Sequence, residues 1–377
     1  MIFELCQDMS AWDQAVLSVG GTLYHTWHWG EYRKRQHWRP WRVLIHDGAP
    51  RGVLQLLEFR PLFLPFPVFY GPSGIGGRLE EGGLQALVSW LRDFLRSRNG
   101  MFLRIDPFIL QTDVPRQDLL TNAGFTLLPR QWLPIFSDIQ RAVMILNVGR
   151  SEPEILAGMR SSHRYYIRHA ADKGLEFESG TNEHQLLALY GLLATTAAAK
   201  GLVPPSLSRL RQLVETVLDH GLGTIFVARH SRQPVAALLV AGFGTTAHLL
   251  YAGSDWSRRS LYANEPLEWL AIEWAMGNGC VEYDMGGIGT LELPKEGHPF
   301  FGIYNFKLGF GAKLHQLTGY FDLVNHPVAY CLHRHLETSG KSAAYRAFRK
   351  MRSLGAAAAI VDLMKAETTT VPGRPRL

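Results

Sequence analysis

The sequence predicts an α/β protein (α+β in detail) that contains two similar domains in tandem, each with a mixed β-sheet. At 377 residues the chain is long enough for two domains of ordinary size. Hydrophobic residues make up 46% of it and charged residues 19%, which is typical of a protein with a packed core rather than of a disordered chain. In addition, one order of predicted elements occurs twice along the chain, as expected for a duplicated domain.

Each copy of this pattern begins with a β-hairpin, continues with an amphipathic helix and ends with a strand that finishes in aspartate. The segments are 43–45 with 53–57, then 87–98 and 102–106 in the first copy, and 225–228 with 235–240, then 267–277 and 281–284 in the second. In both copies an Asn-Gly pair follows the helix and supplies the left-handed residue that ends it. The pattern therefore predicts two related sheets rather than one continuous sheet.

The domain boundary is expected where residues 147–153 read as a loop followed by a helix start. The strand-like segment 317–324 is expected to cross back to the first domain. The predicted bounds are 1–147 for the first domain, completed by about 318–365, 148–317 for the second domain, and 366–377 for a flexible tail.

The most informative motif lies in the second copy. A strand over 281–285 carries Asp284 and is followed by Gly286 and Gly287, which let the backbone turn sharply. An aromatic run over 301–311 then contains a single lysine, Lys307, between two phenylalanines. Such a lysine either extends to the surface or is held in place for chemistry.

This ordered pair, Tyr-Asp-x-Gly-Gly and then Phe-Lys-x-x-Phe, resembles the end of the second domain of the FemABX peptidyltransferases. Those enzymes move an amino acid from aminoacyl-tRNA onto a peptidoglycan precursor. The repeated order of elements is similar to the GNAT (acyl-CoA N-acyltransferase) fold, and FemABX enzymes are built from two such domains. The resemblance covers roughly residues 20–325. It implies two tandem GNAT-like domains and an enzyme that attaches an amino acid to the side-chain amine of a stem peptide, in formation of the interpeptide bridge.

The resemblance also implies roles in the second domain. Lys307 matches a lysine at the reaction centre, where a cation steadies the oxyanion that forms as an amine attacks an ester. One such donor contributes on the order of 3–4 kcal/mol. Asp284, Gly286 and Gly287 are expected to form the turn at the site. The alternative for Lys307 is an ordinary surface lysine.

In the first domain, Arg104 and Asp106 belong to an Arg-x-Asp-Pro segment. The resemblance implies that Asp106 faces the acceptor. Arg33, in the segment that also contains Trp29, stands where the family has a phosphate-binding lysine. An arginine keeps the positive charge of that lysine. Tyr251 matches a Tyr-Ala-Gly-Ser segment that lines the acceptor cleft. The alternatives are a turn-capping aspartate, a solvated arginine and a buried strand tyrosine.

Two departures from the family pattern imply that acceptor binding differs in detail. Met101 stands where the family has a tyrosine, and Pro205 stands where the family has an arginine on the acceptor's phosphate. The precursor, either UDP-MurNAc-peptide or a lipid-linked form, therefore stays open.

The chain is basic, with a net charge of +6 and a pI of about 9.2, which favours anionic partners. A basic helix is predicted over 154–173, in which Arg160, Arg164 and Arg168 could contact tRNA or other phosphates. A second basic amphipathic helix is predicted over 334–352. It is either a solvated surface helix or a peripheral contact with anionic lipid or tRNA.

The sequence predicts no metal site and no cofactor besides aminoacyl-tRNA as co-substrate, because it has no metal-binding His or Cys motif. Its three cysteines, Cys6, Cys280 and Cys331, suit a reducing compartment. No apolar run reaches the length of about 20 residues that crosses a bilayer, and Met1 to Asp8 is not a signal peptide. We therefore expect a cytoplasmic enzyme, at the inner face of the membrane if a basic helix meets lipid.

Two other functions remain open at this stage. One is an acyl-CoA-dependent N-acyltransferase acting on a small amine or a polysaccharide sugar, although the loop at 258–264 lacks the glycine expected for a pyrophosphate site. The other is a non-catalytic protein with the double GNAT fold that binds RNA or membranes. The sequence does not name the transferred amino acid, the proton acceptor or the oligomeric state.

Overall fold

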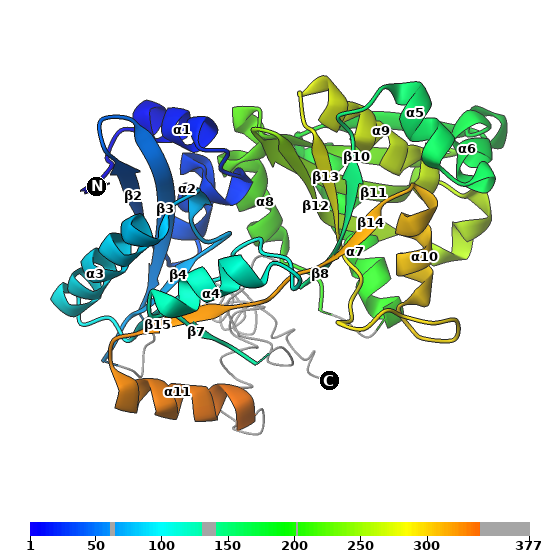
Figure 1. The fold of residues 1–377 in the computed structure, drawn as a ribbon. Helices are drawn as coiled ribbons and strands as arrows, with labels where there is room; N and C mark the ends of the chain where they lie inside the picture. Colours follow the sequence, from blue (N-terminus) through cyan, green and yellow to red (C-terminus); the bar gives the residue numbers. More distant parts are fainter. Residues whose placement is uncertain (61–64, 130–140, 201–202, 340–377) are drawn as a thin grey trace, which may run out of the picture.

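The chain forms two lobes, each around one mixed β-sheet (Figure 1). The structure is a computed structural model that describes residues 1–377 except 61–64, 130–140, 201–202 and 340–377. The strand order is β1-β2-β3-β4-β6-β15-β7 in the first sheet, with β5 on β3, and β14-β8-β13-β12-β11-β10-β9 in the second. The predicted fold class, two tandem GNAT-like domains with mixed sheets, is confirmed.

The first lobe contains the elements of the N-terminal part and two elements that return from the C-terminal part. They are β1 (Ile2–Leu5), α1 (Met9–Ser18), η1 (Leu23–His25), α2 (Trp27–Lys34), β2 (Arg39–His46), β3 (Pro50–Phe59), β4 (Val68–Gly71), β5 (Gly76–Gly77), α3 (Glu81–Ser97), β6 (Phe102–Ile105), α4 (Val114–Asn122), β7 (Thr126–Leu127), β15 (Phe321–Val324) and α11 (Pro327–Ser339). In Figure 1 the returning elements β15 and α11 are orange and lie with the first lobe.

The second lobe contains the remaining elements. They are β8 (Ala142–Asn147), α5 (Glu152–Gly158), α6 (Ser161–Arg168), η2 (Ala171–Lys173), β9 (Leu175–Gly180), α7 (Glu183–Lys200), α8 (Leu207–Thr216), η3 (Leu218–His220), β10 (Gly223–His230), β11 (Gln233–Phe243), β12 (Thr246–Ser254), η4 (Trp256–Leu261), α9 (Asn264–Gly277), β13 (Glu282–Gly287), α10 (Phe301–Gly309) and β14 (Lys313–Gln316).

Both predicted hairpins are confirmed. β2 pairs with β3 and β10 pairs with β11 in antiparallel register. In each lobe a strand that precedes the main helix then runs parallel to the strand after it, as β4 does with β6 and β12 with β13. The Asn-Gly pairs end α3 and α9 with a left-handed residue, which is Asn99 (φ 54°) in the first lobe and Gly279 (φ 74°) in the second.

The sequence prediction differs from the structure at residues 154–173. Instead of one basic helix, this segment forms α5, α6 and η2, because the chain is extended at Met159 and Arg160. Gly158 is a poor helix former, and the break lets the Met159 side chain enter the core. Gly174 ends the segment in a left-handed conformation.

The pairing of β8 and β15 shows to which sheet the chain belongs at each of the two predicted domain junctions. β8 pairs with β13 and β14, so the second sheet begins on the N-terminal side of the expected boundary at 147/148. β15 pairs with β6 and β7, so the chain crosses back to the first sheet where expected. The predicted tail, and the basic stretch beyond Ser339, lie outside the described residues. Among the described helices, none is both long enough and apolar enough to cross a membrane.

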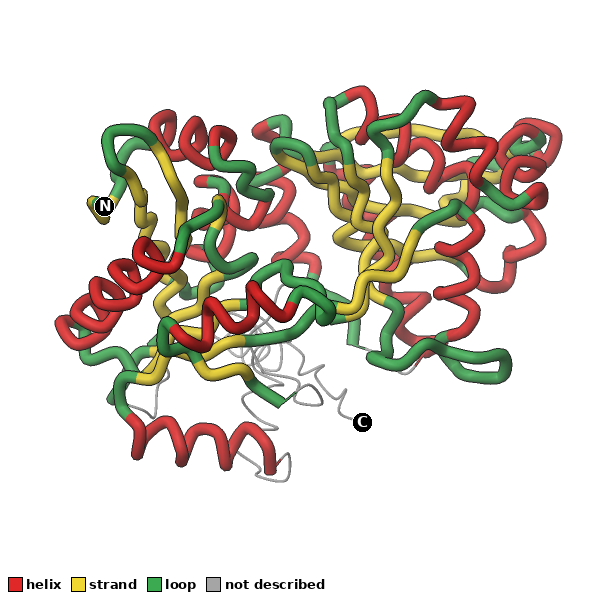
Figure 2. The backbone as a smooth tube through the Cα atoms, viewed as in Figure 1, coloured by secondary structure: helices red, strands yellow, loops and turns green. Residues whose placement is uncertain are grey.

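Both faces of the second sheet are covered by helices (Figure 2). Alternate residues of β11 enter two apolar clusters: Leu238 and Val240 pack with residues of α9, whereas Ala237 and Leu239 pack with residues of α7 and α8. This alternation is expected for a strand that is buried on both faces. The face towards α7 and α8 is the one that meets the first lobe.

The two lobes share this second apolar cluster. Tyr24, Trp29 and Tyr32 of the first lobe belong to the same cluster as Leu189 of α7 and Leu213 of α8. Polar contacts border it: the Tyr32 hydroxyl accepts a hydrogen bond from Arg209 at 3.2 Å, and the rings of His28 and His220 stack 3.9 Å apart. The position of α2 is therefore tied to both lobes.

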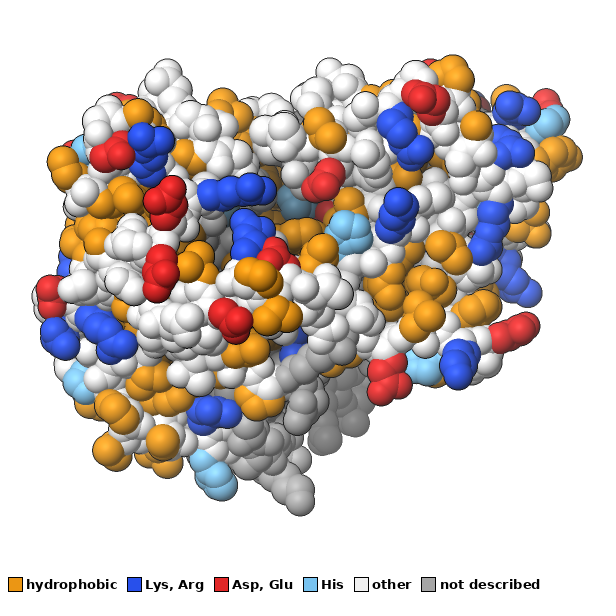
Figure 3. Space-filling view, viewed as in Figure 1, with side chains coloured by type: hydrophobic (Ala, Val, Ile, Leu, Met, Phe, Trp, Pro, Cys, Tyr) orange, Lys and Arg blue, Asp and Glu red, His pale blue; other side chains and the backbone are white. Residues whose placement is uncertain are grey.

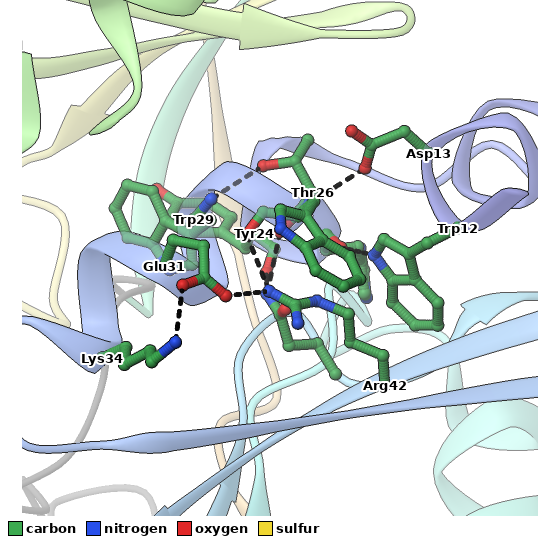
Figure 4. Close-up of polar contacts among 11 residues, drawn as sticks. Trp12, Asp13, Tyr24, Thr26, Trp29, Glu31, Lys34 and Arg42 are labelled. Atoms are coloured by element: carbon green, nitrogen blue, oxygen red, sulfur yellow. Dashed lines mark hydrogen bonds and ion pairs between the residues drawn. The ribbon is translucent and has the colours of Figure 1, made fainter. Parts of the chain in front are cut away.

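Arg42 of β2 holds α2 on the first sheet (Figure 4). Its guanidinium lies over the Trp27 ring at 3.4 Å and donates hydrogen bonds to the Trp27 carbonyl (2.9 Å) and to Glu31 (3.0 Å). The helix comes so close that a Cβ at Gly30 would lie 2.6 Å from the guanidinium and 2.5 Å from Gln55. Any side chain at Gly30 would displace the ends of Arg42 and Gln55, so glycine suits this close packing of α2 on the sheet.

Candidate active site

The side chain of Lys307 points from α10 to the end of β13. Its ammonium donates a hydrogen bond to the Gly287 carbonyl at 2.7 Å, and only 4% of the residue is exposed. A lysine ammonium has three donors. The bond to Gly287 uses one of them, so the group can still donate to a ligand.

The turn at the end of β13 lies beside this ammonium. Asp284 accepts a hydrogen bond from the backbone N–H of Gly286 at 2.8 Å, and the pairing with β8 shifts register between Asp284 and Gly287. Gly286 has a φ of 78° and is partly exposed. A Cβ at this glycine would lie 3.7 Å from the Lys307 ammonium. Glycine thus satisfies the left-handed turn and leaves the space beside the ammonium open.

Two carboxylates oppose the effect of burial on Lys307. Burial lowers the pKa of Lys307 to about 8, whereas Glu268 and Asp284 raise it. Burial likewise raises the pKa of Glu268 to about 7, and its hydrogen bond from Tyr283 and the charge of Lys307 lower it. The two groups therefore titrate together close to neutral pH. Perturbed pKa values of this kind are common at functional sites, and they also occur in structural ion pairs.

Glu268 was not found from the sequence. It lies on the buried face of α9, where its carboxylate accepts a hydrogen bond from the Tyr283 hydroxyl at 2.8 Å. The available signal was a glutamate directly between Leu267 and Trp269, inside a largely apolar helix. A carboxylate is rarely fully buried without a partner, so this position predicted a nearby cation or donor.

His248 connects this turn to the first lobe and was also missed from the sequence. It is the register partner of Asp284 in the parallel β12–β13 pair, and its Nδ1 lies 3.3 Å from the Asp284 carboxylate. The Tyr24 ring packs edge-on against it at 5.0 Å, and Trp29 in turn packs edge-on against Tyr24 at 4.9 Å. Trp29 and Asp284, both predicted site residues, are thereby brought into one connected cluster with Lys307.

Tyr251 lies further along β12, opposite Leu239 of β11, and is partly buried against the shared apolar cluster. The structure explains the adjacent Gly253 by packing: a Cβ there would lie 2.7 Å from the backbone of α7. The Tyr-Ala-Gly-Ser segment is therefore determined at least in part by the contact between β12 and α7.

Asp106 follows β6 in the first lobe. It accepts hydrogen bonds from the Tyr70 hydroxyl (2.5 Å) and from the Ser73 backbone N–H (2.8 Å), and it is buried. These contacts match the alternative of a turn-capping carboxylate, because they hold the glycine-rich segment that follows β4 (residues 71–77). A role on the acceptor stays a prediction for Asp106.

Two first-lobe arginines that were expected to bind substrate are buried in the structure. Arg104 is fully buried and forms ion pairs with Asp322 (2.8 Å) and Glu337 (3.0 Å), so it joins β6 to β15 and α11 instead of contacting substrate. Arg33 is 1% exposed and its guanidinium lies over the Trp38 ring at 5.1 Å. Arg33 is therefore packed inside the first lobe rather than solvated, and a phosphate contact stays a prediction for it.

The three arginines expected to contact tRNA have different surroundings. Arg160 binds Asn305 of α10 at 2.8 Å, and Arg164 bonds the carbonyls of Leu156 and Met159 at the end of α5. Arg168 is exposed. Arg160 and Arg164 therefore have structural contacts of their own, and contact with tRNA stays a prediction for all three arginines.

The arrangement around Lys307 can stabilise negative charge on an oxygen that approaches over Gly286. The ammonium is held by Gly287 and by the fields of Glu268 and Asp284, and burial strengthens its effect on a nearby charge because the local dielectric constant is low. This is the chemistry that attack on an ester or amide carbonyl requires.

Comparison with known proteins agrees with the resemblance found in the motifs. Residues 214–338 match the FemAB family. A Staphylococcus epidermidis protein named lipid II:glycine glycyltransferase is 19% identical over 83% of this chain and 91% of its own length. A Staphylococcus aureus (strain USA300) protein of the same name is 20% identical over 88% and 95%.

Solved structures show the shared fold. The crystal structure of FemX aligns with a TM-score of 0.78 at 18% identity and covers 88% of this chain and 99% of its own. The structure of L-PGS from Bacillus licheniformis aligns with a TM-score of 0.51 at 12% identity and covers 86% and 96%. The predicted similarity to FemABX proteins is confirmed in sequence and in fold.

Proposed function

We propose that this protein is an aminoacyltransferase that takes an amino acid from aminoacyl-tRNA and attaches it to the side-chain amine of a peptidoglycan precursor stem peptide. The similarity to proteins named lipid II:glycine glycyltransferase supports a peptidoglycan precursor as acceptor. The donor is inferred from the resemblance of the motifs. The charged tRNA would place the reaction in the cytoplasm, at the inner membrane face when the acceptor is lipid-linked.

One observation carries the proposal: a buried ammonium, that of Lys307, lies beside a partly exposed glycine turn and retains free donors. In the reaction the acceptor amine forms a bond to the ester carbonyl carbon, and the carbonyl oxygen becomes an oxyanion near Lys307. The bond to the ribose oxygen of the tRNA then breaks, and the proton lost by the amine is balanced by the proton gained by that oxygen. Lys307 steadies the oxyanion and does not itself form a bond.

No metal, cofactor or covalent enzyme intermediate is required in this scheme, because the ester is already activated. Holding amine and ester in alignment supplies much of the remaining rate enhancement, on the order of several kcal/mol. The shared apolar cluster, which contains Tyr24 and Trp29, and the contact of Tyr24 with His248 join the two lobes and so support this alignment.

The test is a transfer assay with the purified protein. Labelled aminoacyl-tRNA is offered with a lipid-linked or a nucleotide-linked stem-peptide precursor, and acetyl-CoA replaces the charged tRNA in a parallel reaction. We expect label on the precursor amine only with charged tRNA. Acylation from acetyl-CoA, or no transfer with any charged tRNA from a total pool, would contradict the proposal.

A further inference from the structure

The first lobe contains a pocket that none of the roles above uses. Its volume is about 640 Å³, within the range of roughly 300–1,000 Å³ of typical ligand sites. It lies between the glycine-rich segment after β4, the start of α3 and the helix α4. Figure 3 shows a hollow on this face of the first lobe, next to the second lobe, with apolar side chains inside it and Lys or Arg side chains at its rim.

The walls of the pocket combine apolar side chains with polar ones, in roughly equal parts. The apolar ones include Val19, Leu79, Leu84, Ile105, Ile109 and Leu119. One wall is a tightly packed turn, because a Cβ at Gly74 would lie 2.9 Å from Pro107. Likewise, Gly77 has a φ of 94°, and a Cβ there would lie 2.5 Å from the Arg51 carbonyl. The glycine turn therefore shapes one wall of the pocket, and the apolar side chains form a part of it that suits an apolar ligand group.

Two arginines supply the charge at this pocket. Arg78 is exposed and forms no ion pair within the described part of the chain, and Arg116 has a single long contact of 3.8 Å with Asp113. His25 contributes no charge at neutral pH, since burial lowers its pKa to about 4 and its ring nitrogens are occupied by Thr22 and Gly74. The pocket lining thus contains two guanidinium groups and one carboxylate, that of Asp113, so its charge favours an anionic ligand. Guanidinium groups suit phosphate oxygens in particular.

We propose that this pocket binds an apolar chain that ends in a diphosphate, with Arg78 and Arg116 on the diphosphate and the chain between the apolar side chains of the walls. Such a group is the lipid end of a lipid-linked acceptor, so the inference rests on the proposed function and selects a lipid-linked acceptor over a nucleotide-linked one. In this proposal Arg78 and Arg116, rather than the buried Arg33, bind the phosphates of the acceptor.

The position of the pocket is consistent with this role. Its wall contains Pro107 and Phe108, which directly follow Asp106. The Phe108 ring lies 6.2 Å from the ring of His315 on β14 of the second lobe. A ligand in this pocket would therefore lie on the first lobe, close to the place where this lobe meets the second lobe, which contains Lys307. The pocket walls offer no pair of facing aromatic rings for a nucleobase, which favours an aliphatic chain.

Binding can be measured without any transfer reaction. Calorimetric titration with farnesyl diphosphate is compared with farnesol, UDP and inorganic pyrophosphate. We expect the wild type to bind farnesyl diphosphate at least tenfold more tightly than the other three. Arg78→Ala combined with Arg116→Ala should weaken it at least tenfold, and Leu79→Trp should weaken farnesyl diphosphate by filling the apolar part.

Arg96→Ala is the matched control, because Arg96 is an exposed arginine of the same lobe that pairs with Asp93 and lies outside the pocket. UDP or pyrophosphate binding as tightly as farnesyl diphosphate would overturn the inference, and so would farnesyl diphosphate binding that the pocket substitutions leave unchanged in folded protein. A wild type that binds farnesyl diphosphate but transfers no amino acid would refute only the proposed function. Transfer without this binding would refute only the pocket.

Discussion

Lys307 shows how a single residue can be both buried and charged. Burial lowers its pKa, and the carboxylates of Glu268 and Asp284 limit the shift, so that the ammonium persists up to a pH of about 8. The folded protein therefore holds a cation that is only weakly solvated and close to losing its proton.

This balance predicts the pH dependence of transfer. Because the pKa of Lys307 is lowered from 10.5 to about 8, the ammonium is lost as pH rises through 8. If the cation is needed, kcat measured with saturating substrates should fall above pH 8. Arginine keeps its charge throughout this range, so the residual activity of Lys307→Arg should lack that decline. A decline of equal midpoint in both proteins would assign it to another group.

At the residue scale, the motif was enough to single out Lys307 and the Asp284 turn, because an isolated lysine among aromatic residues is unusual in sequence. Glu268 and His248 could not be predicted as neighbours of that turn. Their proximity arises from the register of β12 on β13 and from the packing of α9, which the local sequence does not encode. Burial of Arg33 and Arg104 was hidden for the same reason.

At the scale of elements, Arg104 joins three segments that are distant in sequence. Removing it would leave the buried carboxylates of Asp322 and Glu337 without their cation. We expect Arg104→Ala to lower the free energy of unfolding by about 3–5 kcal/mol. Urea unfolding measures this change. Arg96→Ala, which removes an exposed pair, should cost less than about 1 kcal/mol; equal losses in the two variants would show that Arg104 is not a structural centre.

The contact between β12 and α7 gives a second prediction at this scale. A Cβ at Gly253 would lie 2.7 Å from the backbone of Leu192 and Leu193, which cannot move as a side chain could. Gly253→Ala should therefore destabilise the protein by about 1–3 kcal/mol in thermal or urea unfolding. Gly277→Ala near the end of α9 meets nothing within 4 Å and should be neutral or slightly stabilising. A neutral Gly253→Ala would contradict the packing account of this glycine.

The hairpins, the main helices and their Asn-Gly ends were predictable because each depends on local periodicity and turn chemistry. The helix break at Met159 was not predictable, because it accompanies burial of the Met159 side chain, whereas the local sequence pattern favours a continuous helix. The placement of β8 in the second sheet likewise depends on pairing with β13 and β14, which lie far along the chain.

At the scale of the whole molecule, the shared apolar cluster makes the two lobes one structural unit. Trp29 is 5% exposed within this cluster. We expect Trp29→Ala to reduce stability by about 3–5 kcal/mol and to separate the unfolding of the two lobes into distinct urea transitions. Trp256→Ala is the control, because Trp256 is 66% exposed. A single unshifted transition in Trp29→Ala would show that the lobes do not depend on this contact.

The central claim is that Lys307 steadies the oxyanion during amino-acid transfer, and the single-turnover rate of transfer from charged tRNA tests it most directly. We predict that Lys307→Met lowers this rate at least about 100-fold, the effect of losing one oxyanion donor. The variant should stay folded because methionine keeps the apolar stem. Lys313→Met, at an exposed lysine of β14, should leave the rate unchanged. A Lys307→Met rate within threefold of the wild type, in folded protein, would contradict the claim.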